Sequence, residues 1–382
     1  MTDRKTESIS IRSFARNSGR ILLMVFSILL ACLLGLVGIL LRWSPGRPKP
    51  FLDEDGTQLP GSISEKLFLN INGVRQGMFI KGKDAKNPVM LYLHGGMPDY
   101  FLTQRYPTGL EDYFTVGWWE QRGAGLSYGA HVSSETMTPE QFVSDTLEVT
   151  DYLRNRFGKE KIYLMGHSGG TFIGIQAAAQ APELYHAYIG VAQMSDQLES
   201  ERLAYEYMLQ QFREKGNKDI VEELEAAPVT TTGGTPEDYL DLRDKGMHSL
   251  GIGTTHDMNS VVTGLFLPSL RFPEYTLTEK ANMWRAKFSS GVSILWDKAI
   301  ATDLRNELLE LDLPVYFFHG IHDYTVNYTL AKEYFEKLEA PMKGFYTFEH
   351  SAHSPIFEEP EKVQRVLRED VLAGTNGLAD AR

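Results

Sequence analysis

A serine at a predicted strand-to-helix turn is the residue of this chain best placed for nucleophilic chemistry. Ser168 lies in the pentapeptide 166–170, Gly-His-Ser-Gly-Gly, which has the spacing G-x-S-x-G. The short run 161–165 before it, apolar after Lys161, predicts a buried strand, and residues 171–179 after it predict a helix. A serine at such a corner occupies a tight, strained turn, which the outer glycines of the pentapeptide permit because they lack a Cβ. We therefore expect an exposed hydroxyl at a helix N-terminus, where backbone N–H groups favour developing negative charge.

An acid and a histidine that could activate this serine follow it in chain order. Asp323 comes just after the buried-strand pattern of residues 314–320, at the sheet edge where ligand chemistry collects in open α/β folds. His353 follows the next predicted strand, residues 343–348. We expect His353 to take the serine proton as general base, while Asp323 fixes its tautomer and stabilises the imidazolium. His350 is an alternative base that the sequence leaves open.

A third segment could stabilise the oxyanion that forms when the serine attacks a carbonyl group. The predicted strand 88–93 is followed by His-Gly-Gly-Met-Pro at residues 94–98. The backbone N–H groups of Gly96 and Gly169 are the expected donors, and each can contribute roughly 3–4 kcal/mol in the transition state. We expect His94 to brace this loop rather than to transfer protons.

Taken together, these segments resemble an α/β-hydrolase. The stretch 118–127, Trp-Trp-Glu-Gln-Arg-Gly-Ala-Gly-Leu-Ser, is similar to the Asp-Gln-Arg-Gly-x-Gly-x-Ser segment of the proline iminopeptidase (prolyl aminopeptidase) family. The similarity extends over about residues 63–373. It implies a mostly parallel, doubly wound sheet with an inserted helical cap, and cleavage of N-terminal residues without a cofactor.

Three departures from that family's pattern concern specificity for N-terminal proline rather than the fold or the triad. The family's His-Gly-Gly-Pro-Gly is His-Gly-Gly-Met-Pro here, so Pro98 is displaced by one position. The family's Gly-Gly-Ser-Trp-Gly elbow lacks its tryptophan at Gly169. The leading aspartate of the Gln-Arg-Gly motif is Glu120. We interpret Glu120 and Arg122 as structural ties between loops.

Residues 21–41 form an apolar run without a charge, which predicts a single-pass transmembrane helix. As a helix, the run spans about 31 Å, which matches a hydrocarbon core of roughly 30 Å. A cleavable signal peptide has a shorter apolar region that ends in small residues, whereas this run ends in Leu-Leu-Arg-Trp at residues 40–43. A lipoprotein site at Cys32 is disfavoured because nine more apolar residues follow it.

Flanking charge predicts the orientation of this helix. The basic residues are Arg4, Lys5, Arg12, Arg16 and Arg20 before the run, and Arg42, Arg47 and Lys49 after it. Five against three favours a cytoplasmic segment at residues 1–20 and an extracytoplasmic catalytic domain. Residues 42–62 are the expected linker, and its proline-rich part, 45–50, predicts a stiff extended spacer. Cys32 is the only cysteine in the sequence, so no intramolecular disulfide can form.

Charge changes sign after the linker begins. Residues 1–49 carry a net charge of +6, and the remaining 333 residues carry 30 basic and 48 acidic side chains, a net of −18. An acidic globular part argues against nucleic acid as a partner and against adhesion to anionic lipid. It either favours cationic substrates such as peptides with a free amine or serves solubility alone.

Alternation of strands and helices predicts a core made of residues 63–194 and 312–375. The strand signal disappears over residues 195–311, which we interpret as a helical cap that restricts the site to small molecules or chain ends. Candidate pocket residues there are Met208, Trp284, Phe288 and Trp296. The family resemblance implies that cap carboxylates hold the terminal amine of the substrate. The candidates are Glu199, Glu201, Glu206, Glu222, Glu223, Glu225 and Asp257.

The leading hypothesis is a membrane-anchored serine hydrolase with a Ser-His-Asp triad and an acyl-enzyme intermediate. The resemblance favours an aminopeptidase that acts on short peptides or small molecules, with the lipid bilayer as a partner of the N-terminal helix. A carboxylic ester hydrolase with the same triad is the first alternative. A non-catalytic small-molecule sensor or scaffold is the second. No cofactor or metal site is expected, and the sequence leaves the oligomeric state open.

Overall fold

The apolar runs of the sequence pair side by side in one sheet. The computed structural model describes residues 3–129, 132–288 and 291–381, and within them eight strands follow the order β1-β2-β4-β3-β5-β6-β7-β8. The strands are β1 (Ile63–Ile71), β2 (Val74–Gly82), β3 (Val89–Leu93), β4 (Thr115–Glu120), β5 (Ile162–His167), β6 (Tyr185–Val191), β7 (Val315–Gly320) and β8 (Lys343–Phe348). The β1–β2 and β2–β4 pairs are antiparallel, and the others are parallel. The mostly parallel sheet predicted from the sequence is confirmed.

The hairpin between β1 and β2 turns at an Asn-Gly pair. Asn72 and Gly73 have φ values of 46° and 78°, the left-handed region that a two-residue hairpin turn requires at both positions. β1 begins at Ile63 because its partner strand extends to Gly82, which pairs with Ile63.

Each central strand buries both of its faces, which explains why its sequence is continuously apolar rather than alternating. In β3, Leu91 and Leu93 belong to one apolar cluster, whereas Met90 and Tyr92 belong to a second cluster on the opposite face. Helices cover both faces of the sheet. The core helices are α2 (Pro139–Phe157), α3 (Gly169–Gln180), α11 (Tyr328–Lys337), α12 (Pro355–Glu358) and α13 (Pro360–Val366).

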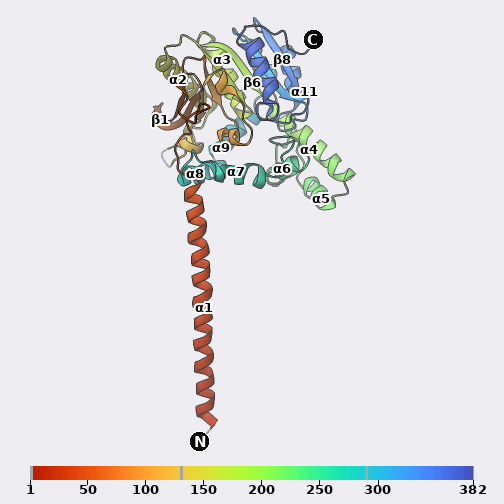
Figure 1. The fold of residues 1–382 in the computed structure, drawn as a ribbon. Coiled ribbons are helices and arrows are strands. Elements are labelled where there is room, and N and C mark those ends of the chain that lie inside the picture. Colours follow the sequence, from red (N-terminus) through yellow and green to blue (C-terminus); the bar gives the residue numbers. More distant parts are fainter. Residues whose placement is uncertain (1–2, 130–131, 289–290, 382) are drawn as a thin grey trace.

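Helical elements fill the segment between β6 and β7. They are α4 (Gln197–Glu214), α5 (Lys218–Ala226), α6 (Glu237–Ser249), η6 (Val262–Phe266), α7 (Leu267–Arg271), α8 (Leu277–Phe288), α9 (Gly291–Ile300) and α10 (Leu304–Glu307). Its first helices share an apolar cluster of their own, which includes Met208 and Tyr239. Figure 1 shows α4, α5 and α6 to one side of the sheet, with α7 and α8 extending toward α1.

The N-terminal helix α1 (Asp3–Arg42) stands away from the rest of the chain in Figure 1. Its part Ile21–Arg42 is long and apolar enough to cross a membrane, and its apolar side chains there are exposed. The proline-rich spacer that follows is extended, as its composition predicts, but it lies against the body of the protein. The N–H of Gly46 donates to the carbonyl of Pro273, and the Lys49 carbonyl accepts from Ser64 and Lys81.

Candidate active site

A cavity of about 210 Å³ lies between the sheet and the helical segment that follows β6. The core contributes the loop after β3 and residues Ser168, Gly169 and His353 to its lining. Apolar and basic side chains enclose it from the helical side, namely Arg243, Met247, Leu265, Lys287, Leu295 and Trp296. The structure therefore brings the predicted serine and histidine into one enclosed space.

Ser168 occupies the strained turn that its sequence predicts. It sits between β5 and α3 with φ 56° and ψ −127°, a conformation that L-residues rarely adopt. The close approach of two backbones enforces this geometry. A Cβ added at Gly170 would collide with the Leu93 carbonyl oxygen, so only glycine fits there. The serine hydroxyl consequently lines the cavity at the N-terminus of α3.

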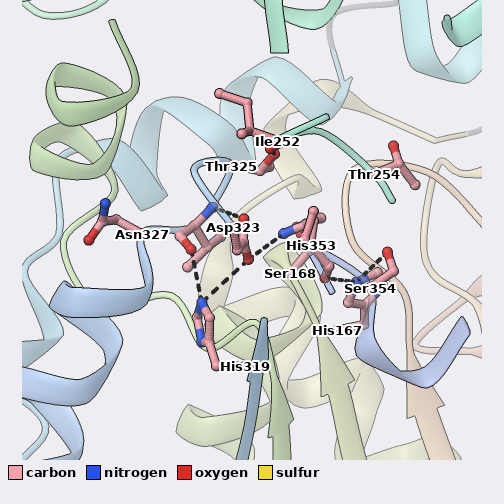
Figure 2. A network of polar contacts seen from close by, with 12 residues as sticks. His167, Ser168, Ile252, Thr254, His319, Asp323, Thr325, Asn327, His353 and Ser354 are labelled. Atoms are coloured by element: carbon pink, nitrogen blue, oxygen red, sulfur yellow. Dashed lines mark hydrogen bonds and ion pairs between the residues drawn. The ribbon is translucent and has the colours of Figure 1, made fainter. Parts of the chain in front are cut away.

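His353 is held by Asp323, as the sequence predicts. The Nδ1 atom of His353 lies 2.9 Å from Asp323 Oδ2, and the carboxylate is 1 % exposed. The other oxygen of Asp323 accepts the backbone N–H of Val326 at 2.9 Å. Figure 2 shows a second histidine, His319, on the same carboxylate, with its Nε2 atom 3.3 Å from Oδ2. Burial alone would raise the pKa of Asp323, but the two imidazoles outweigh it and hold the pKa well below its usual range.

The protonation state of His353 suits a general base. Burial lowers its pKa below the ordinary histidine value, and Asp323 only partly offsets this effect. The ring is therefore neutral at physiological pH, and its Nδ1–H bond to Asp323 leaves Nε2 unprotonated. Within the described residues, neither Nε2 nor the Ser168 hydroxyl has a hydrogen-bond partner. Both groups are free to engage each other and a substrate that enters the cavity.

The two predicted oxyanion donors lie next to each other. A Cβ built on Gly169 would lie 3.9 Å from the backbone nitrogen of Gly96, and both residues line the cavity. Gly169 is the first residue of α3, so no carbonyl of that helix can accept its N–H. His94 braces the loop, since its Nε2 accepts the N–H of Gln121 and its Nδ1 lies 2.8 Å from the Gly95 carbonyl. Burial lowers the pKa of His94, which keeps the ring neutral in this role.

A second buried histidine, His167, contacts the backbone of His353. His167 Nδ1 lies 2.9 Å from Asp99 Oδ2, and its Nε2 lies 3.0 Å from the backbone carbonyl of His353. Both partners are acceptors, so the ring satisfies both only when it is doubly protonated. Burial lowers the pKa of His167, but the bonds to Asp99 outweigh it and raise the pKa above the ordinary value. The ring centroids of His167 and His353 are 5.0 Å apart, so a positive charge on His167 disfavours a second one on His353.

This arrangement predicts the pH dependence of turnover. A general base acts in its neutral form, and the pKa of His353 is lowered. With His353 as the base, we expect kcat/KM to rise to its plateau with a midpoint below pH 6.5. Replacing His167 with glutamine removes the neighbouring charge while keeping polar groups near Asp99, and should move that midpoint to higher pH. Profiles of kcat/KM from pH 4 to 9 for both proteins would check this. An unchanged midpoint in His167→Gln would show that the two rings are not electrostatically coupled.

Arg122 lies outside the cavity lining and ties the loop after β4 to α2. Its Nε and Nη2 atoms bind the two oxygens of Asp145 at 2.7 and 2.8 Å, and both side chains are almost fully buried. Side-chain amides complete the shell around this carboxylate, from Asn72, Gln76 and Gln141. Glu120 likewise connects separate segments, because it accepts hydrogen bonds from the Tyr275 hydroxyl and the Leu126 N–H. Burial raises the pKa of Glu120 to about 8.

Breaking the Arg122–Asp145 pair should destabilise the fold strongly. Replacing Asp145 with alanine leaves a buried guanidinium without its partner, which costs about 3–5 kcal/mol of the free energy of unfolding. Asp151→Ala on the same helix is the matched control. Its carboxylate is 56 % exposed in its pair with Arg154, and a pair open to solvent is worth at most about 1 kcal/mol. Urea unfolding of both variants would measure the difference. Equal destabilisation would contradict the structural role of the buried pair.

Several candidates from the sequence lie away from the cavity. His350 is exposed, and its N–H donates to Glu359, so it is not placed as the base. Of the four candidate pocket residues only Trp296 lines the cavity. Met208 is buried in the cluster of α4 to α6, whereas Trp284 packs between Phe266 and Phe288 on the surface.

The seven candidate cap carboxylates also lie outside the lining. Most are already engaged by basic or hydroxyl groups; Glu201, for example, is fully buried and accepts from Arg243 and Tyr239. The pairs of the others are Glu199 and Glu206 with Arg202, Glu225 with Arg213, and Asp257 with Tyr106, while Glu222 and Glu223 are exposed. The carboxylates that do line the cavity in the described structure are Asp99 and Asp244. Neither was selected from the sequence.

Sequence reasoning also missed three residues that position the predicted triad. His167 and His319 contact it as described, and Glu358 accepts the N–H groups of Ala352 and Ser354, on either side of His353. A faint signal existed for His319, a histidine in an otherwise apolar strand, and for His167, the variable residue inside the G-x-S-x-G pentapeptide. Nothing local indicated Glu358.

The sheet, the elbow and the cavity define the class of this protein. Residues 89–360 match the sequence profile described as the alpha/beta hydrolase fold, and the chain belongs to that family. The chain is 32 % identical over 330 residues to the protein named "probable aminopeptidase YbaC" of Bacillus subtilis (strain 168), covering 80 % of this chain and 96 % of the relative.

Solved structures show the same fold at lower identity. A proline iminopeptidase of Mycobacterium smegmatis is similar with a TM-score of 0.53 and 14 % identity, covering 81 % of this chain and all of that one. A proline iminopeptidase-related protein of Thermus thermophilus has a TM-score of 0.51 and 19 % identity, covering 81 % and 99 % of the two chains. The resemblance stated from the sequence motifs is confirmed.

Proposed function

We propose that this protein is a serine hydrolase that releases N-terminal residues from short peptides through an acyl-enzyme, with Ser168, His353 and Asp323 as its triad. The observation that carries the proposal is the 2.9 Å contact between His353 Nδ1 and Asp323 in the cavity that Ser168 also lines. The likeness to an aminopeptidase over most of the chain supports the peptide substrate.

In this mechanism the Ser168 oxygen attacks the substrate carbonyl carbon while His353 Nε2 accepts the hydroxyl proton. The N–H groups of Gly96 and Gly169 bind the resulting oxyanion, and Asp323 stabilises the imidazolium. Collapse of the intermediate breaks the C–N bond as His353 gives its proton to the leaving amine. Water then attacks the acyl-enzyme with His353 again as base, which releases the acid and restores the serine.

Hydrolysis of carboxylic esters is a second candidate, favoured by the charge of the cavity. Asp244 contacts both Arg243, at 3.2 Å, and Lys287, at 3.3 Å. Burial would raise the pKa of Asp244, but these two cations lower it to about 2. The carboxylate is thus ionised, but Glu201 also binds Arg243, so the two cations and two carboxylates of this group carry no net charge. A group without net charge attracts a substrate ammonium weakly and suits a neutral acyl substrate.

Matched substrates distinguish the two activities. We expect the full chain to cleave aminoacyl-arylamides, including the prolyl one, and to lose this activity when the substrate amine is acetylated. An ester hydrolase would instead turn over short acyl esters and ignore the free amine. Failure on all of these substrates, with Ser168 still labelled by a fluorophosphonate, would exclude both simple activities. Absence of labelling would favour the non-catalytic sensor.

We also propose that α1 anchors the enzyme in a membrane, with its N-terminus in the cytoplasm and the catalytic domain outside. The apolar stretch Ile21–Arg42 and the excess of basic residues before it support this orientation. Within the catalytic domain, residues 63–194 and 312–375 form the core and residues 195–311 form the cap in this proposal. Protease protection of tagged chains in sealed vesicles would test the orientation.

A further inference from the structure

The end of the membrane helix is fixed to the cap rather than tethered by a flexible linker. Lys280 on α8 is almost fully buried, and its ammonium donates to the Trp43 carbonyl, the Ser44 hydroxyl and the Leu270 carbonyl at 2.7, 2.9 and 2.6 Å. One residue further on, Pro45 pairs with Thr276 in a β-bridge. These contacts place α7 and α8 next to the C-terminal end of α1, where its apolar stretch ends. Figure 1 shows α8 at the end of α1, with α7 beside it.

The elements at this level expose apolar side chains. Val262, Phe266 and Phe288 are 57 %, 36 % and 79 % exposed, and the Trp284 ring packs against both phenylalanines. We call these four residues the cap face. The Trp284 N–H donates to the Ser269 hydroxyl at 2.9 Å. The polar atom of the ring therefore has its hydrogen bond within the protein and the rest of the ring is apolar, a combination typical of aromatic side chains at membrane interfaces.

The charges around the cap face suit phospholipid headgroups. The domain as a whole is acidic, but the segments that meet at the end of α1 carry Arg42, Arg47 and Arg271, and α8 carries Arg285. The guanidinium of Arg271 lies 5.6 Å from the centre of the Trp43 ring, at the end of α1. The acidic residues of this stretch, Glu274 and Glu279, are paired with Lys81 and Lys66. The unpaired acidic residues farther away are screened by salt, whereas basic side chains at a membrane surface are attracted to anionic lipid over a short range.

The cap face and the Ser168 cavity lie on opposite sides of the same two elements, η6 and α8. Leu265 lines the cavity, whereas Val262 and Phe266 in the same turn of η6 are exposed. On α8, Lys287 lines the cavity and its neighbour Phe288 is exposed. A molecule held at the membrane surface against these elements is therefore separated from the cavity by the thickness of η6 and α8.

We propose that the cap face rests on the bilayer, and that the Ser168 cavity receives amphiphilic substrates from the membrane surface across η6 and α8. The hydrolytic part of this inference rests on the proposed function. The contact of the cap face with lipid does not. Apolar burial in the interface and nearby basic side chains would together hold the body of the enzyme against the leaflet.

Lipid contact can be measured without turnover. In a Cys32→Ser background, which removes the only native cysteine, Val262→Cys and Phe288→Cys would each carry an environment-sensitive fluorophore. Glu183→Cys is the control, because it is exposed just beyond the end of α3 that points away from the cavity. The full chain would be reconstituted into vesicles of phosphatidylcholine and phosphatidylglycerol. We expect spin-labelled lipid to quench positions 262 and 288 several-fold more than 183. Equal quenching at all three would overturn the proposal.

Substrate delivery has its own test. The triple variant Val262→Ser, Phe266→Ser, Phe288→Ser should hydrolyse a substrate embedded in vesicles about tenfold more slowly than the parent, with unchanged turnover of a soluble short one. Leu309→Ser is the control, since Leu309 is 40 % exposed and precedes β7 at the opposite edge of the sheet from Ser168. An equal loss on both substrates would overturn delivery through the cap face. A parent inactive on both would instead refute the proposed function and leave the quenching result to decide lipid contact.

Discussion

Replacing Ser168 with alanine is expected to lower kcat by on the order of 10⁵- to 10⁶-fold, with the fold intact. The variant removes the attacking oxygen but leaves Asp323, His353 and the backbone donors in place, so the remaining activity would come from binding and oxyanion stabilisation alone. The turn should tolerate alanine, because the constraint lies in the backbone rather than in the hydroxyl, which has no hydrogen-bond partner in the described structure. Turnover and fluorophosphonate labelling of the same preparation would check this.

The control for this variant is Ser249→Ala, an exposed serine on α6 outside the cavity lining. It should keep full turnover and full labelling. Labelling that persists in Ser168→Ala would identify another nucleophile and contradict the triad.

Replacing Asp323 with asparagine is expected to lower kcat by about 10⁴-fold at neutral pH. The geometry dictates which way the new amide turns. The Val326 N–H donates to Asp323 Oδ1 at 2.9 Å and needs an acceptor there in the variant as well. The amide oxygen of the asparagine therefore takes the place of Oδ1. Its NH₂ group then faces His353 Nδ1 and can only donate to it. The imidazole proton is forced onto Nε2, which becomes a donor toward Ser168 and can no longer accept its proton.

This second effect differs from simple destabilisation, because Asp323→Asn keeps the volume and the Val326 contact. KM should change far less than kcat, and the unfolding midpoint should stay close to that of the parent. Kinetics and urea unfolding on the same protein would separate the two explanations. A decrease in kcat of less than tenfold would show that Asp323 does not control the tautomer of His353.

Much of the site could be predicted because its parts depend on local constraints. The runs that became β3, β5 and β7 are buried on both faces, so they are continuously apolar and end abruptly at their functional residues. The elbow is recognisable since the backbone approach at Gly170 excludes every other side chain. Asp323 and His353 follow strand ends, and parallel strands place those ends at one edge of the sheet.

The contacts that tune the site could not be predicted, since they join residues far apart in the chain. His167 meets Asp99 from 68 positions away and the His353 carbonyl from 186. The same holds for the carboxylates after β6, where Glu201 is neutralised by Arg243, 42 residues later. Hydropathy marks the apolar part of a helix rather than its first residue, so α1 extends to Asp3 although its apolar run starts at residue 21.

The contacts of the Lys280 ammonium determine where this protein can be truncated to remove its apolar N-terminal helix. Expression that starts at Trp43 removes the apolar helix and retains all three oxygens around that amine. Starting at Phe51 instead would strand a cation in the interior with the Leu270 carbonyl alone. The shorter polypeptide should therefore be the less stable of the two, even though it omits only eight further residues.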